Sequence, residues 1–402
     1  MAPSFFPLDE ELGLVPGRLS PGLQQAVARL GAALPFGQVP AIMELLVGVS
    51  LTGSMVRRCT EQVGAALVAL DDARVRAIEQ QLPEHPVGAR CQQISVDGAM
   101  VPLRGGEWRE VKTLVIGELS VAESGAADQL SYVSRMQEAE DFAWSATAEL
   151  HRRGTFAAEQ VVAVVDGARW CQGFIDYHRP DAIRVLDFPH ALEHLSQAAQ
   201  SCFGSGTAQV SEWLADQRAT LLTGDPATVV QAVAELPVDQ ATDPAAARQI
   251  RDQVHAYLTR RLAQMTYADF QAQGWPIASG IVESANKLVV EVRLKGAGMH
   301  WAIANVDPML ALRCAICNDT WPTVWSQIVR HLRQRARRSQ PRPVLDPEPT
   351  PAPPPEAAVR SASSPPRRPS PYFSNGKPND THPWKRMPTV AHRQTQRAIT
   401  KK

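Results

Sequence analysis

The chain has 402 residues, 44% of them hydrophobic, with 41 basic and 41 acidic side chains. This composition is ordinary for a globular protein and leaves room for two domains, or for one large domain with an extension. No segment approaches the roughly 18 apolar residues that span a bilayer, and no basic segment followed by an apolar stretch begins the chain, which argues against a membrane partner or export and predicts a cytoplasmic location.

Residues 1–90 have the pattern of a helical region. A helix that ends near Gly48, with Ser50 capping the next one, resembles a helix-turn-helix. Arg57 and Arg58 would then lie on the early turns of a helix that enters the major groove of DNA. Plain packing of a helical hairpin is the alternative, because many such hairpins carry a Gly in the turn.

From residue 91 the pattern changes to strands. Three β-rich runs, "QQISVDGAMVPL", "EVKTLVIGEL" and "QLSYVSRM", precede a helix at about 138–152, the apolar run "EQVVAVVDGARW", a second helix and the strand "DAIRVLDF". The order β-β-β-α-β-α-β predicts an α/β protein whose ribonuclease-H-like mixed sheet is flanked by helices. We expect 91–188 to be the first part of this core, an all-helical insertion to occupy 189–270, and the core to resume at 271–338.

The C-terminal end is basic. From Arg330 onwards there are 16 Lys and Arg against 4 Asp and Glu, and the segment 339–402 is rich in Pro and Arg. This composition predicts a disordered tail. A basic tail after an acidic body suggests an anionic partner, most simply DNA, although a solvated tail without a partner has the same composition.

Three carboxylates occupy positions where a charge needs a partner. Asp97 in "SVDGAMV" and Asp166 in "VVDGARW" each follow an apolar strand and precede a Gly, and adjacent first and fourth strands would bring both to one edge of the sheet. Glu283 in "ASGIVESANK" lies among small and apolar residues near a helix start, where an unpaired carboxylate is costly. Three carboxylates suit two Mg²⁺ or Mn²⁺ ions, which catalyse phosphodiester transfer by activating the attacking oxygen and stabilising the leaving one. Asp-Gly after a strand is also an ordinary turn signal, so a structural role is the alternative.

Five blocks, "SVDGAMV", "VVDGARW", "DFPHALEHL", "SGIVESANKLV" and "RLKGAGMHW", resemble those of the DDE transposases of bacterial insertion sequences, specifically the Kra-four family of the Mutator-like group. The resemblance runs from about residue 5 to 325, and "NGKPNDTHPWKR" is similar to that family's terminus. It implies a transposase that cleaves DNA and transfers strands, with two metal ions held by Asp97, Asp166 and Glu283. It also implies DNA partners, namely terminal repeats and target DNA, a homo-oligomer on DNA and association with the nucleoid. Family members usually carry a further segment ahead of "FFPLDEELGL", so we expect this copy to be shortened.

Basic and histidine side chains near the carboxylates are further candidates. Lys287, Arg293 and Lys295 would contact DNA phosphate. Because Lys287 follows Glu283 by four residues, a helical ion pair is the alternative. Histidines are expected beside the carboxylate site, with structural packing as the alternative: His190, His194 and His300.

Two other functions fit parts of the sequence. His190, Glu193 and His194 match H-x-x-E-H, the inverted zinc-protease motif, with both His on one helical face. A zinc metalloprotease leaves Asp97 and Asp166 without a role. The second is a non-catalytic DNA-binding relic of a transposase, in which the three acids persist without turnover.

Overall fold

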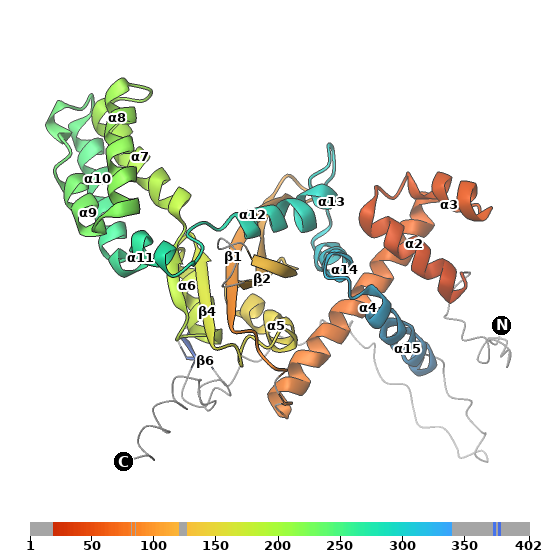
Figure 1. Cartoon of the computed structure of the whole chain (residues 1–402). Coiled ribbons are helices and arrows are strands. Elements are labelled where there is room, and N and C mark those ends of the chain that lie inside the picture. The colour runs from red at the N-terminus through yellow and green to blue at the C-terminus, as the bar shows by residue number, and fades with distance from the viewer. Residues whose placement is uncertain are drawn as a thin grey trace, which may run out of the picture.

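The computed structural model describes residues 19–81, 83–84, 86–119, 127–339, 373–374 and 377–378 (Figure 1). The block "FFPLDEELGL" and nearly all of the expected tail at 339–402 lie outside these residues. In the described ranges no helix is long and apolar enough to cross a membrane.

A five-stranded mixed sheet forms the centre of the molecule, in the order β3-β2-β1-β4-β5. The first three strands pair antiparallel, whereas β4 pairs parallel with β1 and β5 pairs parallel with β4. The strands are β1 (Cys91–Pro102), β2 (Trp108–Leu119), β3 (Ala127–Arg135), β4 (Gln160–Val165) and β5 (Ile183–Leu186). Much of β1, β2 and β4 is buried on both faces, which explains their nearly continuous apolar runs. The predicted mixed sheet with flanking helices is confirmed.

Helices cover both faces of this sheet. On one face α5 (Ala139–Arg152) and α6 (Arg169–His178) bury alternate residues of β1 and β4, among them Ile94 and Ala163. On the opposite face the β1 residues Ala99 and Val101 join a second core with the N-terminal and C-terminal helices. The alternation of side chains along a strand therefore decides which core each residue enters.

The N-terminal helices pack on the last two helices of the described chain (Figure 1). Their bounds are α2 (Pro21–Ala33), α3 (Val39–Val47), α4 (Gly53–Gln80), α14 (Val306–Cys317) and α15 (Trp321–Ser339). As expected, α3 ends at Gly48, which adopts the left-handed conformation with φ 67°. The expectation that Ser50 caps α4 is wrong. Because α4 begins only at Gly53, the Thr52 hydroxyl accepts the Met55 N–H at 3.2 Å, and Ser50 instead donates to Glu44.

The segment after β5 forms a helical lobe that extends away from the sheet (Figure 1). It contains α7 (Phe188–Phe203), α8 (Ala208–Thr223), α9 (Pro226–Ala234), α10 (Pro244–Thr259) and α11 (Tyr267–Ala272), with short 3₁₀ turns η1 (Val238–Gln240) and η2 (Leu262–Gln264). Asp225 and Asp243 cap α9 and α10, and each is followed by a Pro at the first helical position. The lobe has its own apolar core, which is continuous with residues of β4 and β5.

The chain then returns to the sheet in a helical segment from Gly280 to Leu294. It consists of α12 (Gly280–Ala285), the π-helical stretch η3 (Asn286–Glu291) and α13 (Val292–Leu294), and a 3₁₀ turn η4 (Ile303–Asn305) leads into α14. Two short strands, β6 (Phe373–Ser374) and β7 (Lys377–Pro378), pair with each other further along the chain. Helix α12 contacts β1 and β2, so it places Glu283 over the centre of the sheet.

Candidate carboxylate site

Asp97 on β1 and Asp166, the residue after β4, belong to two strands that pair parallel in the sheet. The pairs Cys91 with Gln160 and Ile94 with Ala163 are each 69 residues apart, and continuing this register places Asp97 beside Asp166. Asp97 alternates with Ile94 and so lies on the face of Ala99 and Val101, opposite α5 and α6. Asp166 follows the last residue of β4, and its carboxylate hydrogen-bonds to the first turn of α6.

Asp97 is held by two hydrogen bonds, one to each carboxylate oxygen. The backbone N–H of Gly98 donates to Oδ1 at 2.7 Å. The side-chain Nδ2 of Asn286, at the start of the π-helical stretch, donates to Oδ2 at 2.8 Å. Asn286 is only 6% exposed, and its buried Oδ1 has no partner among the described residues. The contact ties the helix that carries Glu283 to the strand that carries Asp97.

The electrostatic environment raises the pKa of Asp97 to about 6. Burial is the main cause, and the hydrogen bond from Gly98 opposes it. Negative charge from three other carboxylates adds to the rise: Asp166, Glu110 and Glu283. The three predicted acids thus interact through their charges although they are far apart in the sequence.

Asp166 lies in a tight turn between β4 and α6. Its Oδ1 accepts the backbone N–H of Ala168 at 2.8 Å and the thiol of Cys171 at 3.3 Å. Gly167 has φ 79°, and a Cβ there would meet Arg261 Nε at 2.5 Å and the Tyr257 hydroxyl at 2.6 Å. The glycine after Asp166 is therefore required by both its conformation and its crowding. This finding supports the turn interpretation of the Asp-Gly pair at Asp166.

Glu283 is exposed on the first turn of α12, three residues before Asn286 and on the same face of the helix. In the described parts of the chain, no three or more His, Cys, Asp and Glu side chains are arranged to hold a metal ion. The structure therefore brings Asp166 and Glu283 within the range of the charge of Asp97, but the described residues do not form a three-ligand set.

No protein-family model and no curated protein matches this sequence.

Two other carboxylates near the site have structural partners. Asp187, which follows β5, is 5% exposed and caps α7 by accepting the His190 N–H at 3.0 Å. Its other oxygen accepts the Ser279 N–H at 2.6 Å, so it fastens the start of the helical lobe to the segment that enters α12. Glu291, the second acid on the Glu283 helix, pairs with Lys295 at 2.7 Å.

Sequence reasoning missed two polar residues at the site. Glu110, from β2, packs against Gly98, where a Cβ would lie 2.2 Å from its Oε1, and it pairs with Lys112 at 2.7 Å. The second is Asn286. Its burial has a sequence signal, because Asn286 shares the helical spacing of the apolar residues Val282, Ala285 and Val289, all of which are buried.

His190 and His194 face each other on α7, with their Nε2 atoms 3.2 Å apart. The His194 ring lies on Tyr257, with centroids 4.1 Å apart. Burial lowers the pKa of His194, and the charges of His190 and Arg261 lower it further. A zinc protease needs a third ligand, and in the described chain no group of three such side chains includes this pair.

The basic residues expected to contact DNA have different surroundings. Lys287 is exposed, and Lys295 is occupied by Glu291. Arg293 is 2% exposed, and its guanidinium lies over the Phe36 and Trp301 rings, 4.6 and 4.9 Å from their centroids. The expectation that Arg293 contacts DNA phosphate is therefore not supported, because its charge is enclosed by aromatic packing.

Arg57 and Arg58 are exposed on α4, and Arg57 lines a pocket of about 240 Å³ together with Arg104 and His300. This pocket lies at the far end of β1, where the Trp301 N–H donates to the Pro102 carbonyl at 3.1 Å. Five residues of strand separate Pro102 from Asp97, a distance of roughly 16 Å at 3.3 Å per residue. His300 is therefore remote from the carboxylates rather than beside them.

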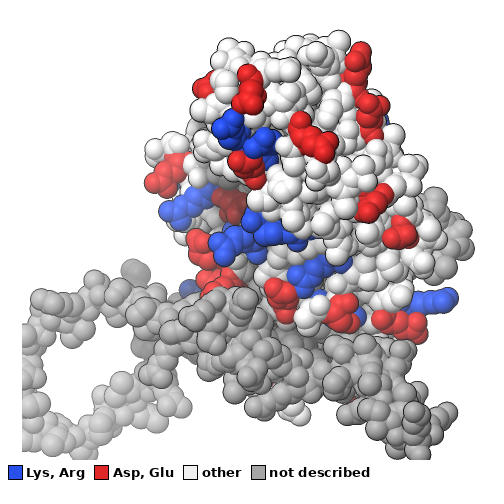
Figure 2. Space-filling view, turned by 90° about the vertical axis from the view of Figure 1, so that its left-hand side faces the viewer, with Lys and Arg blue, Asp and Glu red and all other residues white. Residues whose placement is uncertain are grey.

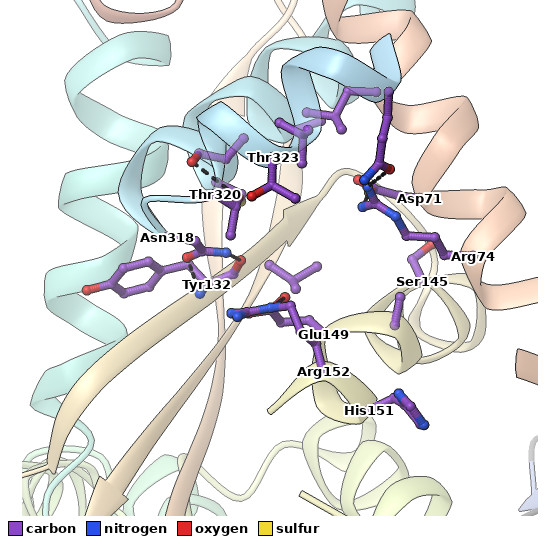
Figure 3. Close-up of a pocket in the computed structure, with 18 of the residues that line it drawn as sticks. Asp71, Arg74, Tyr132, Ser145, Glu149, His151, Arg152, Asn318, Thr320 and Thr323 are labelled. Atoms are coloured by element: carbon purple, nitrogen blue, oxygen red, sulfur yellow. Dashed lines mark hydrogen bonds and ion pairs between the residues drawn. The ribbon is translucent and has the colours of Figure 1, made fainter. Parts of the chain in front are cut away.

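A larger cavity, of about 720 Å³, lies between α4, α5, β3 and the last two helices (Figure 3). None of the predicted site residues lines it. Its charged side chains pair with one another: Asp71 binds Arg74 at 2.7 Å and Arg135 at 2.8 Å. The carboxylate chemistry therefore lies outside this cavity.

Proposed function

We propose that the protein is a DDE transposase that cleaves DNA and transfers strands with two Mg²⁺ or Mn²⁺ ions. The observation that carries the proposal is that Asp97 on β1 lies within the range of the charges of Asp166, which follows the adjacent parallel strand β4, and of Glu283, whose helix is tied to Asp97 by Asn286. Acids from three distant segments then face one region of the sheet. DNA would be the partner of the protein. More than one subunit would bind the paired DNA ends, and the protein would associate with the nucleoid.

The strand arrangement supports a ribonuclease-H-like core. In the order β3-β2-β1-β4-β5 only β2 runs against the other four strands. The helical lobe separates the second acid from the third, as the long spacing between Asp166 and Glu283 in the sequence requires. The sequence blocks and the strand order are independent features, and both favour the same fold.

The donor set fits divalent cations. A carboxylate such as Asp97, whose pKa is raised by burial and by neighbouring negative charge, is stabilised when a cation takes the place of a proton, and hard cations prefer carboxylate oxygens. Asp97, Asp166 and Glu283 would hold the ions, which supply an activated attacking oxygen and a stabilised leaving oxygen. The protein's own contribution is orientation: the N–H groups of Gly98 and Ala168 and the amide of Asn286 fix the two aspartates. Because Glu283 is exposed, its side chain would turn toward the sheet on binding.

The test is Mn²⁺ binding by calorimetry, followed by Mn²⁺-dependent nicking of supercoiled DNA. We expect Asp97→Asn and Glu283→Gln to abolish nicking. Glu291→Gln is the matched control, because it makes the same chemical change two turns along the same helical segment at an acid paired with Lys295. If Glu283→Gln and Glu291→Gln lose nicking activity to the same extent, Glu283 is not the third metal ligand.

The same assay separates the alternatives. A DNA-binding relic would bind DNA in wild-type form without any metal-dependent nicking. A zinc protease would lose peptide cleavage in His190→Ala or His194→Ala. Its Zn²⁺ affinity would be the same in Asp97→Asn as in wild type. Neither result is compatible with the proposed transposase.

A further inference from the structure

A concave pocket of about 560 Å³ lies where the helical lobe meets the sheet. Its lining comes from α6 and from the end of α10 with the turn η2, and it contains three arginines, two amides and no acid: Arg169, Gln172, Arg260, Arg261 and Gln264. Figure 2 looks onto this side of the molecule and shows Lys and Arg side chains gathered near the middle of the face, with acidic side chains mostly around them. The pocket therefore concentrates positive charge.

These charges are not neutralised by ion pairs within the part of the chain that the structure describes. Within the described residues, Arg169, Arg260 and Arg261 form no ion pair with a carboxylate, whereas Arg248 and Arg251 on α10 pair with Asp239 and Asp252, each at 2.8 Å. Arg169 and Arg260 are also exposed. Three unpaired cations around one concavity attract an anion.

Unused hydrogen-bond donors also point to an anionic ligand. Arg261 Nε and Gln172 Nε2 are buried and have no partner in the described part of the chain. The oxygen of the Gln172 amide is already engaged by Arg184 at 3.1 Å and Gln264 at 3.3 Å, which leaves its Nε2 as the free group. One acceptor, the Oε1 of Gln264, is unpartnered as well. The donors outnumber the acceptors, as a phosphate ligand requires.

The pocket is connected to the carboxylate site through the backbone. Arg261 donates to the carbonyl of Gly167, and the Tyr257 hydroxyl donates to the carbonyl of Asp166 at 2.6 Å. The guanidinium of Arg261 is fixed over the Tyr257 ring, 3.8 Å from its centroid. Arg169 follows Asp166 by only three residues. If one phosphate of a DNA strand lies at Asp166, the neighbouring phosphates of that strand would lie next to this pocket.

We propose that this arginine pocket binds the phosphodiester backbone of the DNA strand that enters the carboxylate site. The inference rests on the proposed function and adds a binding site formed jointly by α6 and the helical lobe. The contacts are to phosphate, so they position the strand without reading its sequence.

The test compares the salt dependence of DNA binding, measured by fluorescence anisotropy with one duplex of fixed sequence, for Arg169→Ala/Arg260→Ala and for Arg248→Ala/Arg251→Ala. Both double variants remove two positive charges, but the second removes arginines that the protein already pairs. We expect the first to weaken binding about tenfold per arginine near 0.1 M salt and to reduce the slope of log K against log salt by about 2, because each phosphate contact contributes about 0.9. For the control Arg248→Ala/Arg251→Ala, we expect a slope of log K against log salt close to that of wild type.

Equal losses in the two double variants would overturn the proposal, because net charge alone would then explain them. Displacement of the DNA by inorganic phosphate, beyond the effect of chloride at the same ionic strength, would also overturn it in favour of a site for free phosphate. If wild-type protein binds no DNA at 50 mM salt, the proposed function itself fails. Unchanged Mn²⁺ binding in Arg169→Ala/Arg260→Ala would show that the carboxylate site is intact.

Discussion

Replacing Asp97 by Asn is expected to stabilise the metal-free protein at neutral and alkaline pH. The pKa of Asp97 rises from 3.8 to about 6 in the folded state. The folded state therefore favours the protonated acid, so this group's contribution to stability is fully present below pH 3.8 and is lost as the pH rises through about 6. At 1.36 kcal/mol per pKa unit the loss is at most about 3 kcal/mol, and about 1–3 kcal/mol after allowance for partial exposure.

The hydrogen bonds at Asp97 favour this substitution. In Asp97→Asn the oxygen of the introduced amide would keep the bond from the Gly98 N–H. The nitrogen of that amide would face the donor of Asn286, but rotation of the Asn286 amide brings the unpartnered Oδ1 of that residue into the same place. The variant then removes the charge and also supplies a partner for a buried oxygen.

Urea unfolding in EDTA at pH 4.5 and pH 8 measures the effect. We expect Asp97→Asn to exceed wild type by about 1–3 kcal/mol at pH 8 and by much less at pH 4.5. Mn²⁺ at 100 times its dissociation constant should stabilise wild type by about 2.7 kcal/mol and leave the variant unchanged. Asp216→Asn, at an exposed position on α8, is the matched control and is expected to stay within about 0.5 kcal/mol of wild type. Equal or lower stability of Asp97→Asn at pH 8 would refute the charge-cluster argument.

Three further predictions follow from particular contacts. Asn286→Leu, which releases Asp97 Oδ2, should weaken Mn²⁺ binding about 10- to 100-fold by calorimetry, and unaltered affinity would contradict a positioning role. Arg135→Met should destabilise the protein by about 1–3 kcal/mol in urea unfolding, because it removes one of the two arginines that pair with the partly buried Asp71, and Asp71→Asn in the same chain should restore part of the loss. If Arg135→Met/Asp71→Asn is destabilised as much as Arg135→Met alone, the ion pair between Asp71 and Arg135 does not explain the loss. Gly167→Ala should cost about 1–3 kcal/mol, given its φ of 79°, and a neutral result would show that the turn relaxes freely.

The sequence predicted much of the sheet because its signals are local. Apolar strands and the turn residues between them indicated β1 to β5 and the two helices between them in the correct order, and Gly48 marked the end of α3. Errors arose where two nearby residues offer the same chemistry. Ser50 and Thr52 are both good helix caps, and only the position at which the backbone becomes helical selected Thr52.

Candidate site residues were harder to predict because burial depends on tertiary contacts. Arg293 and Lys287 are basic residues on one helical segment, yet Arg293 is enclosed by Phe36 and Trp301 whereas Lys287 is exposed. No local signal distinguishes them, since the aromatic residues come from distant segments. His300 was likewise expected near the carboxylates, but the pairing of Trp301 with Pro102 holds it at the far end of β1.

The sequence by itself determined the alternation of strands and helices and the identity of three acids in strand-end and helix-start positions, because these depend on neighbouring residues and on short periods. The strand order also predicted that β1 lies beside β4, whereas the tertiary structure decided the register in which Cys91 pairs with Gln160 and Ile94 with Ala163. It also decided that Asn286 joins the helix of Glu283 to Asp97 and that arginines of α6 and the lobe share a pocket. These juxtapositions depend on packing between segments tens to hundreds of residues apart, which a local pattern cannot specify.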